Sequence, residues 1–255
     1  MGISVGFPNL INPGSDLHFL LLKEWLEMCD NSHYDHGFAA REEKFLPTRV
    51  LHVGDPPDYD NMHLHITSDG EKGIYVTLSH RWGGDELLKT TIGNLKDFRE
   101  KIKFSQLPKM FKDAVVVTRR LGIKYLWIDS LCIIQEGDGL DDWTNQSQRM
   151  EEVFASANCT IAATSATESA KGFLIPRPSK RSVKLSDIEH NDLHVYVSEL
   201  NVDFHHDVEE GELNKRAWVL QERALSRRTI HFTEGQTYWE CGSVIRGENL
   251  VQMIK

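Results

Sequence analysis

The segment Ile123-Lys-Tyr-Leu-Trp-Ile128 decides the fold class of this chain. A continuous apolar run with little alternation is typical of a central strand that is covered on both faces. Two runs of similar character lie before and after it, Ile74-Tyr-Val-Thr-Leu-Ser79 and Cys159-Thr-Ile-Ala-Ala-Thr164. Helical periodicity over residues 107–121 and 142–157 separates the three runs. This alternation of strands and helices predicts an α/β fold with a parallel sheet flanked by helices.

The other periodic segments predict additions to that sheet. Residues 15–29 carry apolar residues at helical spacing, and the runs 48–54 and 63–67 favour a β-hairpin after them. We therefore expect an N-terminal extension of helix and hairpin, residues 1–72, packed on a main domain, residues 73–255. Within the main domain we expect an inserted hairpin over 182–198, a short helix over 216–226 and terminal strands over 229–232 and 236–241.

Composition narrows the class of protein. The 255 residues include 29 Lys and Arg against 38 Asp and Glu, so the net charge of −9 opposes binding to nucleic acid. The four cysteines are widely spaced and form no C-x-x-C pair, which is typical of reduced thiols rather than of a disulfide framework. No apolar run is long enough to cross a membrane and no signal peptide is recognisable. We expect a soluble, cytoplasmic protein.

The loop after the first predicted core strand combines groups that bind ligands. It carries hydroxyl, imidazole, guanidinium and carboxylate side chains, together with two glycines that permit a ligand to approach the backbone closely. Ligands bind at the carboxyl ends of parallel strands in open α/β sheets, so this loop is a candidate site. The alternative is a structural turn in which the tryptophan packs into the core. The candidate substrate-binding residues are Ser79, His80, Arg81, Trp82, Gly83, Gly84 and Asp85.

Asp129 follows the second predicted core strand at the same end of the sheet. A carboxylate there can orient a ribose or a cation, and we include it among the substrate-binding candidates. The alternative is that it caps the backbone of the next loop. Cys132 lies among apolar residues and is predicted to be a buried hydrophobic residue rather than a nucleophile.

The predicted helix near the C-terminus places a carboxylate beside an indole. Helical spacing puts Trp218 on an apolar arc with Ala217, Leu220, Ala224 and Leu225, with Gln221 inside the arc and Glu222 at its edge. Glu222 is a candidate catalytic group in that position, with Trp218 and Gln221 as substrate-binding candidates. The alternative is an ion pair of Glu222 with Arg223, Arg227 or Lys215.

Metal and cofactor motifs are sparse. Cys29, His33 and His36 share one face if the first helix continues, but no fourth ligand accompanies them, so the sequence does not predict a structural zinc ion. The chain has no G-x-S-x-G elbow, no P-loop and no G-x-G-x-x-G, which excludes the standard hydrolase, nucleotide triphosphatase and dinucleotide-cofactor motifs.

Several blocks of this sequence resemble the fungal heterokaryon-incompatibility (HET) domain. They occur in the order of that family and span about 150 residues. The flanks Leu46-Pro-Thr-Arg49, His231-Phe-Thr and Tyr238-Trp-Glu-Cys241 are also similar to those of the family. The blocks are Tyr75 to Gly83, Leu107-Pro108, Asp113-Ala114, Leu121 to Gln135, Asp142-Trp143, Ala157 to Ala163 and Arg216 to Arg223.

A more remote similarity connects the chain to Toll/interleukin-1 receptor (TIR) domains. Leu78-Ser-His-Arg81 resembles the loop after the first TIR strand. Gly122-Ile123 with Asp129 resembles the Gly-Ile…Asp pattern of the second TIR strand. Trp218-Val-Leu-Gln-Glu222 matches, apart from Val219, the Trp-Cys-Leu-x-Glu helix that carries the catalytic glutamate of NAD-cleaving TIR domains. The resemblance implies a TIR-like (flavodoxin-like) parallel sheet, to which this chain adds β-hairpins and the N-terminal extension.

The two resemblances together imply a cell-death effector of fungal non-self recognition. By analogy with TIR enzymes, Glu222 would hold the nicotinamide ribose of NAD while the glycosidic bond breaks, and the 79–85 loop would cradle the diphosphate with Arg81 as its charge partner. Trp82 or Trp218 would stack on a ring, and the active form would be a homo-oligomer. The alternative is a non-enzymatic module that signals by self-association through the 182–198 hairpin or the N-terminal helix.

Overall fold

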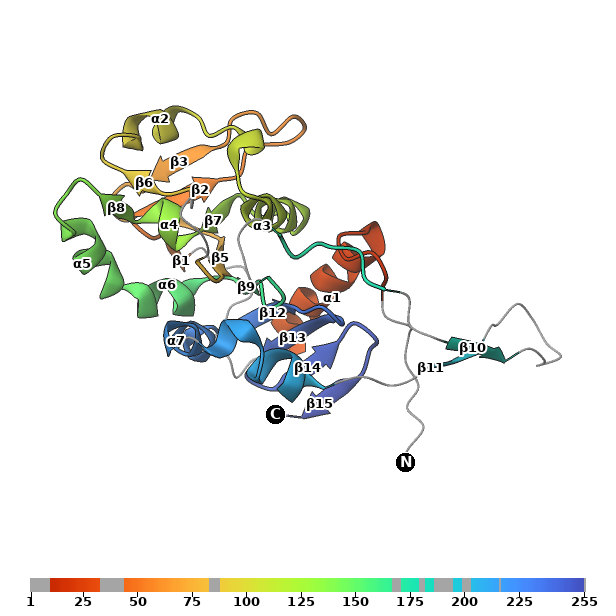
Figure 1. The fold of residues 1–255 in the computed structure, drawn as a ribbon. Helices are drawn as coiled ribbons and strands as arrows, with labels where there is room; N and C mark the ends of the chain where they lie inside the picture. Colours follow the sequence, from red (N-terminus) through yellow and green to blue (C-terminus); the bar gives the residue numbers. More distant parts are fainter. Residues whose placement is uncertain are drawn as a thin grey trace.

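A nine-stranded mixed β-sheet with helices on both faces forms the centre of the computed structural model (Figure 1). The structure describes residues 10–32, 44–82, 88–166, 171–178, 182–185, 195–198, 203–215 and 217–254. In sheet order the strands are β15 (Gln252–Ile254), β14 (Val244–Gly247), β13 (Thr237–Cys241), β12 (Arg228–Phe232), β9 (Thr160–Ala162), β5 (Tyr75–Ser79), β7 (Tyr125–Trp127), β2 (Arg49–His52) and β3 (His63–Ile66).

The centre of the sheet is parallel and its two sides are antiparallel. Strands β7, β5, β9 and β12 pair in parallel, which confirms that the three predicted core strands lie side by side in one direction. The other five of the eight neighbouring pairs are antiparallel, so the parallel sheet that we expected is limited to the central strands, and the sheet as a whole is mixed. The reason lies in the connections: short loops join β2 to β3 and link β12 through β15, and such loops can connect only antiparallel neighbours.

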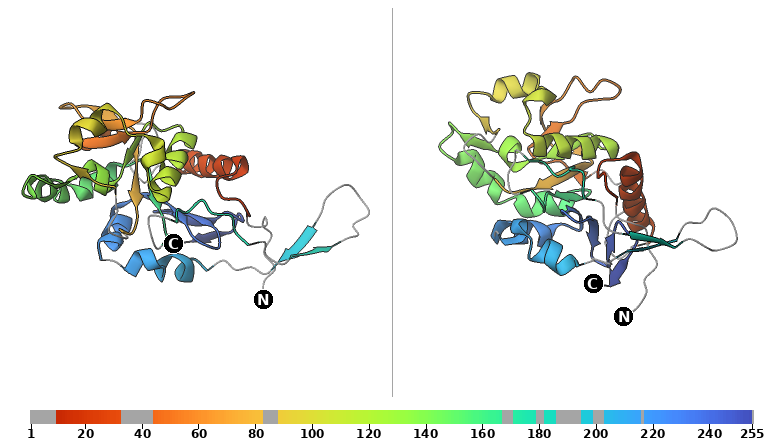
Figure 2. Two further views of the ribbon diagram at one scale, coloured as in Figure 1. Left: turned by 45° about the horizontal axis from the view of Figure 1, so that its top comes forward. Right: turned by 45° about the vertical axis from the view of Figure 1, so that its right-hand side comes forward.

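Helices cover both faces of the sheet (Figures 1 and 2). Helices α1 (Asp16–Ser32) and α3 (Lys109–Arg120) pack on one face, where the ring of His18 meets Phe232 edge-on with centroids 5.9 Å apart. Helices α6 (Met150–Ser156) and α7 (Ala217–Leu225) pack on the other, where Tyr75 donates a 2.6 Å hydrogen bond to the carbonyl of Val153. None of the helices in the described part of the chain has the length and apolar character that a membrane crossing requires.

The helix predicted over residues 142–157 is divided in two. Helix α5 (Asp141–Ser147) buries none of its residues, and Trp143 is 43% exposed. Asp142 in α5 is tied to the side chain of Arg49 and to the backbone N–H of Ile134, whereas α6 turns Phe154 into the core. Because the helix is interrupted between α5 and α6, Asp142 can keep its hydrogen bonds while Phe154 packs in the core.

Both predicted hairpins are confirmed, one within the main sheet and one as a separate two-stranded sheet. The β2–β3 hairpin extends one edge of the main sheet, and β10 (Ser182–Leu185) pairs with β11 (Val195–Ser198) as a separate hairpin that projects from the body of the molecule (Figure 2). The remaining elements are β1 (Lys44–Phe45), β4 (Lys72–Gly73), β6 (Thr90–Thr91), β8 (Ile134–Glu136), α2 (Leu95–Glu100), α4 (Asp129–Cys132), the 3-10 turns η2 (Phe104–Gln106) and η4 (Glu212–Lys215), and the π-helical turn η3 (His205–Glu209).

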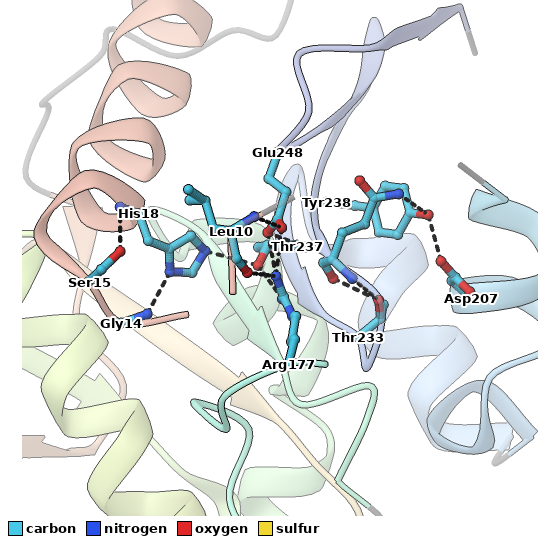
Figure 3. A network of polar contacts seen from close by, with 11 residues as sticks. Leu10, Gly14, Ser15, His18, Arg177, Asp207, Thr233, Thr237, Tyr238 and Glu248 are labelled. Carbon is cyan, nitrogen blue, oxygen red and sulfur yellow. Dashed lines mark hydrogen bonds and ion pairs between the residues drawn. The ribbon is translucent and has the colours of Figure 1, made fainter. Parts of the chain in front are cut away.

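A buried polar network ties helix α1 to the C-terminal strands (Figure 3). Arg177 Nη1 donates to Glu248 Oε2 at 2.6 Å, and Glu248 also accepts the backbone N–H of Thr237 at 2.8 Å. The Nε2 atom of His18 lies 2.9 Å from the hydroxyl of Thr237. A buried charge is tolerated only when it is paired and hydrogen-bonded, and this network meets both conditions.

Candidate functional site

The candidate site is built on a hydrogen bond between Ser79 and Glu222. Ser79 is the last residue of β5, and its Oγ donates to Glu222 Oε2 on α7 at 2.5 Å. Alternate strand residues share a face, so Tyr75, Thr77 and Ser79 all point towards the α6–α7 layer. Ser79 is buried, whereas Glu222 is half-buried. The Glu222 carboxylate therefore lies between the buried end of β5 and the protein surface.

A chain of hydroxyl groups holds α7 on the sheet below this pair. The hydroxyls of Thr77 and Thr160 are 2.8 Å apart, and that of Thr160 is 2.6 Å from Ser226 Oγ. Ser226 Oγ in turn donates to the carbonyl of Glu222 at 2.7 Å. This set of hydroxyls was not predicted from the sequence, although the two-residue spacing of Thr77 and Ser79 places both hydroxyls on one strand face.

The polar face of the sheet explains why the predicted apolar arc of α7 was wrong. Trp218 and Leu220 are 60% and 61% exposed, and Gln221 is also exposed. The inward face carries Val219, which is buried, and Glu222, because the strands below present hydroxyls as well as apolar groups.

Two of the three cations proposed as ion-pair partners of Glu222 bind other carboxylates. Arg223 donates to both oxygens of Glu240, at 2.8 Å and 3.0 Å, and Lys215 donates to Glu212 at 2.5 Å. The Arg223 contact fixes α7 to β13 on the side away from Ser79.

A second carboxylate, Asp129, stands at the end of the neighbouring strand β7. Its Oδ2 accepts a 2.7 Å hydrogen bond from the indole N–H of Trp82, and its Oδ1 lies 3.8 Å from His80 Nδ1. Oδ1 also accepts the backbone N–H of Ser130 at 2.7 Å, so Asp129 contacts both the first turn of α4 and the loop after β5. The hydroxyl of Ser130 is fully buried and has no hydrogen-bond partner among the residues that the structure describes.

The remaining predicted binding residues are not all brought to this place. Arg81 forms an exposed ion pair with Glu212 at 3.6 Å. Gly83, Gly84 and Asp85 lie outside the described residues. So do His33 and His36, two of the three metal candidates, while Cys29 is buried and hydrogen-bonded to Cys241. In the described ranges, no three His, Cys, Asp or Glu side chains are arranged to hold a metal ion.

The site therefore has two carboxylates on either side of the end of β5. Ser79 and His80 are consecutive, and they bind Glu222 and contact Asp129 respectively. Carboxylates in such positions can accept hydrogen bonds from ligand hydroxyls and stabilise positive charge that develops on a ligand. A separate hollow of about 520 Å³ lies between α7 and the end of β13, and its lining does not include Glu222.

Some of the sequence blocks that resemble the HET domain meet in space. Arg49, from the N-terminal flank, pairs with Asp142 and donates to the carbonyl of Cys132 at 2.7 Å. Asp113 accepts the backbone N–H of Phe173 at 2.9 Å. These contacts give Arg49, Asp142 and Asp113 structural roles.

Comparison with known proteins gives one clear match. Neither the curated proteins nor the solved structures yielded a match to this chain. The sequence model described as Heterokaryon incompatibility protein (HET) matches residues 75–222, from the first residue of β5 to the carboxylate that binds Ser79. The match covers more than half of the chain, and on this basis the protein belongs to the heterokaryon-incompatibility (HET) family.

Proposed function

We propose that this HET protein is a cell-death effector that cleaves NAD at the nicotinamide glycosidic bond. The observation that carries the proposal is the Ser79–Glu222 hydrogen bond, which holds a half-buried carboxylate at the carboxyl end of a central parallel strand. Family membership supports the role in incompatibility, and the position of Glu222 supports the chemistry.

The strand order supports the choice of this end of the sheet. Numbered in chain order, the four parallel strands β7, β5, β9 and β12 run 2-1-3-4. This is the order of flavodoxin-like sheets, in which ligands bind where the strand order reverses. The reversal lies between β5 and β9, and Ser79 pairs there with Ala162 at the ends of the two strands.

Glu222 is suited to a reaction that develops positive charge on a ribose. The bond between the nicotinamide nitrogen and the ribose carbon breaks, the electron pair leaves with nicotinamide, and the ribose becomes an oxocarbenium-like cation that water then attacks. A carboxylate that accepts hydrogen bonds from the ribose hydroxyls stabilises this cation. The hydroxyl of Ser79 orients the carboxylate, and the exposed rings of Trp82 and Trp218 are available to stack on the bases.

Self-association is the second candidate function, and exposed apolar side chains favour it. Helix α1 exposes Leu17 and Leu20, and β10 exposes Val183. Large exposed apolar side chains are typical of surfaces that bind a partner. Both functions are compatible with a homo-oligomer, because an enzyme site can be completed by assembly.

Purified protein incubated with NAD over a series of protein concentrations tests the proposal. We expect release of nicotinamide, and we expect Glu222→Gln to lower the rate by about 100-fold or more, because it keeps the shape and removes the charge. Glu27→Gln, an exposed carboxylate of α1 on the opposite face of the sheet, is the matched control and should keep the wild-type rate. Circular dichroism verifies that both variants are folded.

Two results would contradict the proposed NAD-cleaving function. Wild-type rates in a folded Glu222→Gln variant would remove the catalytic role of this residue. Killing of host cells by a wild-type protein that releases no nicotinamide at any concentration would favour the self-association function.

A further inference from the structure

Two cysteines that are far apart in sequence meet between α1 and β13. Cys29 lies near the end of α1 and Cys241 is the last residue of β13, and both belong to the main apolar core. The thiol of Cys29 donates a hydrogen bond to the sulfur of Cys241. Both residues lie outside the segment 75–222 that matches the family.

The strand register places Cys241 beside a residue that is tied to α1. Arg228 of β12 pairs directly with Cys241 of β13, so their side chains lie on the same face of the sheet. Arg228 forms an ion pair with Asp30, the residue after Cys29 in α1. The ion pair therefore holds the end of α1 near the end of β13, the part of the sheet that carries Cys241.

The surroundings of Cys241 favour its thiolate. The hydrogen bond from Cys29 lowers the pKa of Cys241, and hydrogen bonds from the backbone N–H groups of Ser243 and Val244 act in the same direction, against the opposing effect of burial. The same contact raises the pKa of Cys29, since its thiol is the donor. By contrast, burial raises the pKa of Cys159 to about 12. A thiolate is the reactive form of cysteine, so the two kinds of site differ in reactivity.

We propose that Cys241 and Cys29 form an oxidative modification site, in which a peroxide converts the two thiols into a disulfide between α1 and β13. The Cys241 thiolate attacks one oxygen of the peroxide, the O–O bond breaks, and sulfenic acid and hydroxide form; the hydroxide takes up the proton that the Cys241 thiol had released and becomes one water. The thiol of Cys29 then attacks the sulfenic sulfur, the S–S bond forms, and the hydroxyl leaves with the proton of Cys29 as a second water. The peroxide is reduced and the two thiols are oxidised, with no other reagent.

Treatment of the purified full chain with hydrogen peroxide tests the site directly. After free thiols are alkylated, peptide mapping is expected to show one cross-linked pair, Cys29 with Cys241, and unmodified thiols at Cys132 and Cys159. The cross-link is expected to raise the melting temperature by about 5–15 °C, because it closes a long loop in the unfolded chain. Dithiothreitol should reverse both effects.

Substitutions separate the roles of the two thiols. In Cys29→Ser the cross-link should be lost and dimedone should trap sulfenic acid at Cys241, whereas Cys159→Ser, the matched buried control, should keep the cross-link. Mapping of the wild type needs no substitution, so a variant that fails to fold leaves the test intact. Oxidation first at Cys132 or Cys159, intermolecular disulfides, or no product containing Cys29 and Cys241 would overturn the proposal.

Discussion

Acid should destabilise this protein through His18, which is buried in its neutral form. The Nδ1 atom of His18 accepts the backbone N–H of Gly14 at 2.9 Å, so the ring proton resides on Nε2, which donates to Thr237. A proton added to Nδ1 would face the N–H of Gly14 and remove that hydrogen bond. Burial, and then the nearby charge of Arg177, lower the pKa of His18 from 6.5 to about 4.

The direction and size of the effect follow from this pKa. The unfolded chain binds a proton at His18 below about pH 6.5, whereas the folded chain binds it only near pH 4, so stability falls as the pH decreases between these values. The full difference is worth about 3 kcal/mol, of which about 2 kcal/mol is lost between about pH 7.5 and pH 5.

Urea unfolding at a series of pH values measures this loss, with tryptophan fluorescence as the signal. The histidine term is isolated by comparing wild type with His18→Gln, which cannot titrate; we expect the two stability curves to converge as the pH falls. Substitution of the exposed His206 to Gln is the control and should leave the pH dependence as in wild type. Parallel curves for wild type and His18→Gln between about pH 5 and pH 7.5 would refute the reasoning.

Two further outcomes test the buried network and the candidate site. Glu248→Gln should lower the free energy of unfolding by about 3 kcal/mol, since it leaves the buried Arg177 without its counter-charge; the exposed Glu234→Gln is the control in urea unfolding, and equal stability of the two variants would contradict the expectation. Ser79→Ala should lower the rate of nicotinamide release about 10- to 100-fold with little change in melting temperature, because the carboxylate of α7 loses the donor that orients it. An unchanged rate would show that Ser79 has no part in positioning that carboxylate.

The central strands were predictable because their burial is visible in the chain itself. The runs that became β5, β7 and β9 are rich in apolar and β-branched residues with little alternation, and the helical segment before β7 has an apolar stripe. The hairpins were also predictable from local signals. Their attachment to the sheet was not, because a β2–β7 pairing depends on contacts between segments more than 70 residues apart.

The site was only partly predictable for a related reason. The orientation of α7 depends on what the sheet presents to it, and the hydroxyls of Thr160 and Ser226 act as partners only after the strands have paired. An apolar arc drawn on the isolated helix therefore pointed Leu220 inwards, whereas the structure exposes it. Helical spacing made Glu222 a candidate, and the resemblance to TIR domains favoured catalysis over an ion pair, whereas Cys29 and Cys241 could not be paired from spacing.

The long separation of Ser79 and Glu222 has a consequence during synthesis of the protein. The two residues are 143 positions apart, and the β5 strand that carries Ser79 is made well before α7 exists. At about 5–20 residues per second, a ribosome needs several seconds or more to extend the chain from one to the other. A nascent chain therefore lacks one half of the site until Glu222 has been added, and any chemistry that needs both residues begins only after α7 has left the ribosome and docked on the sheet.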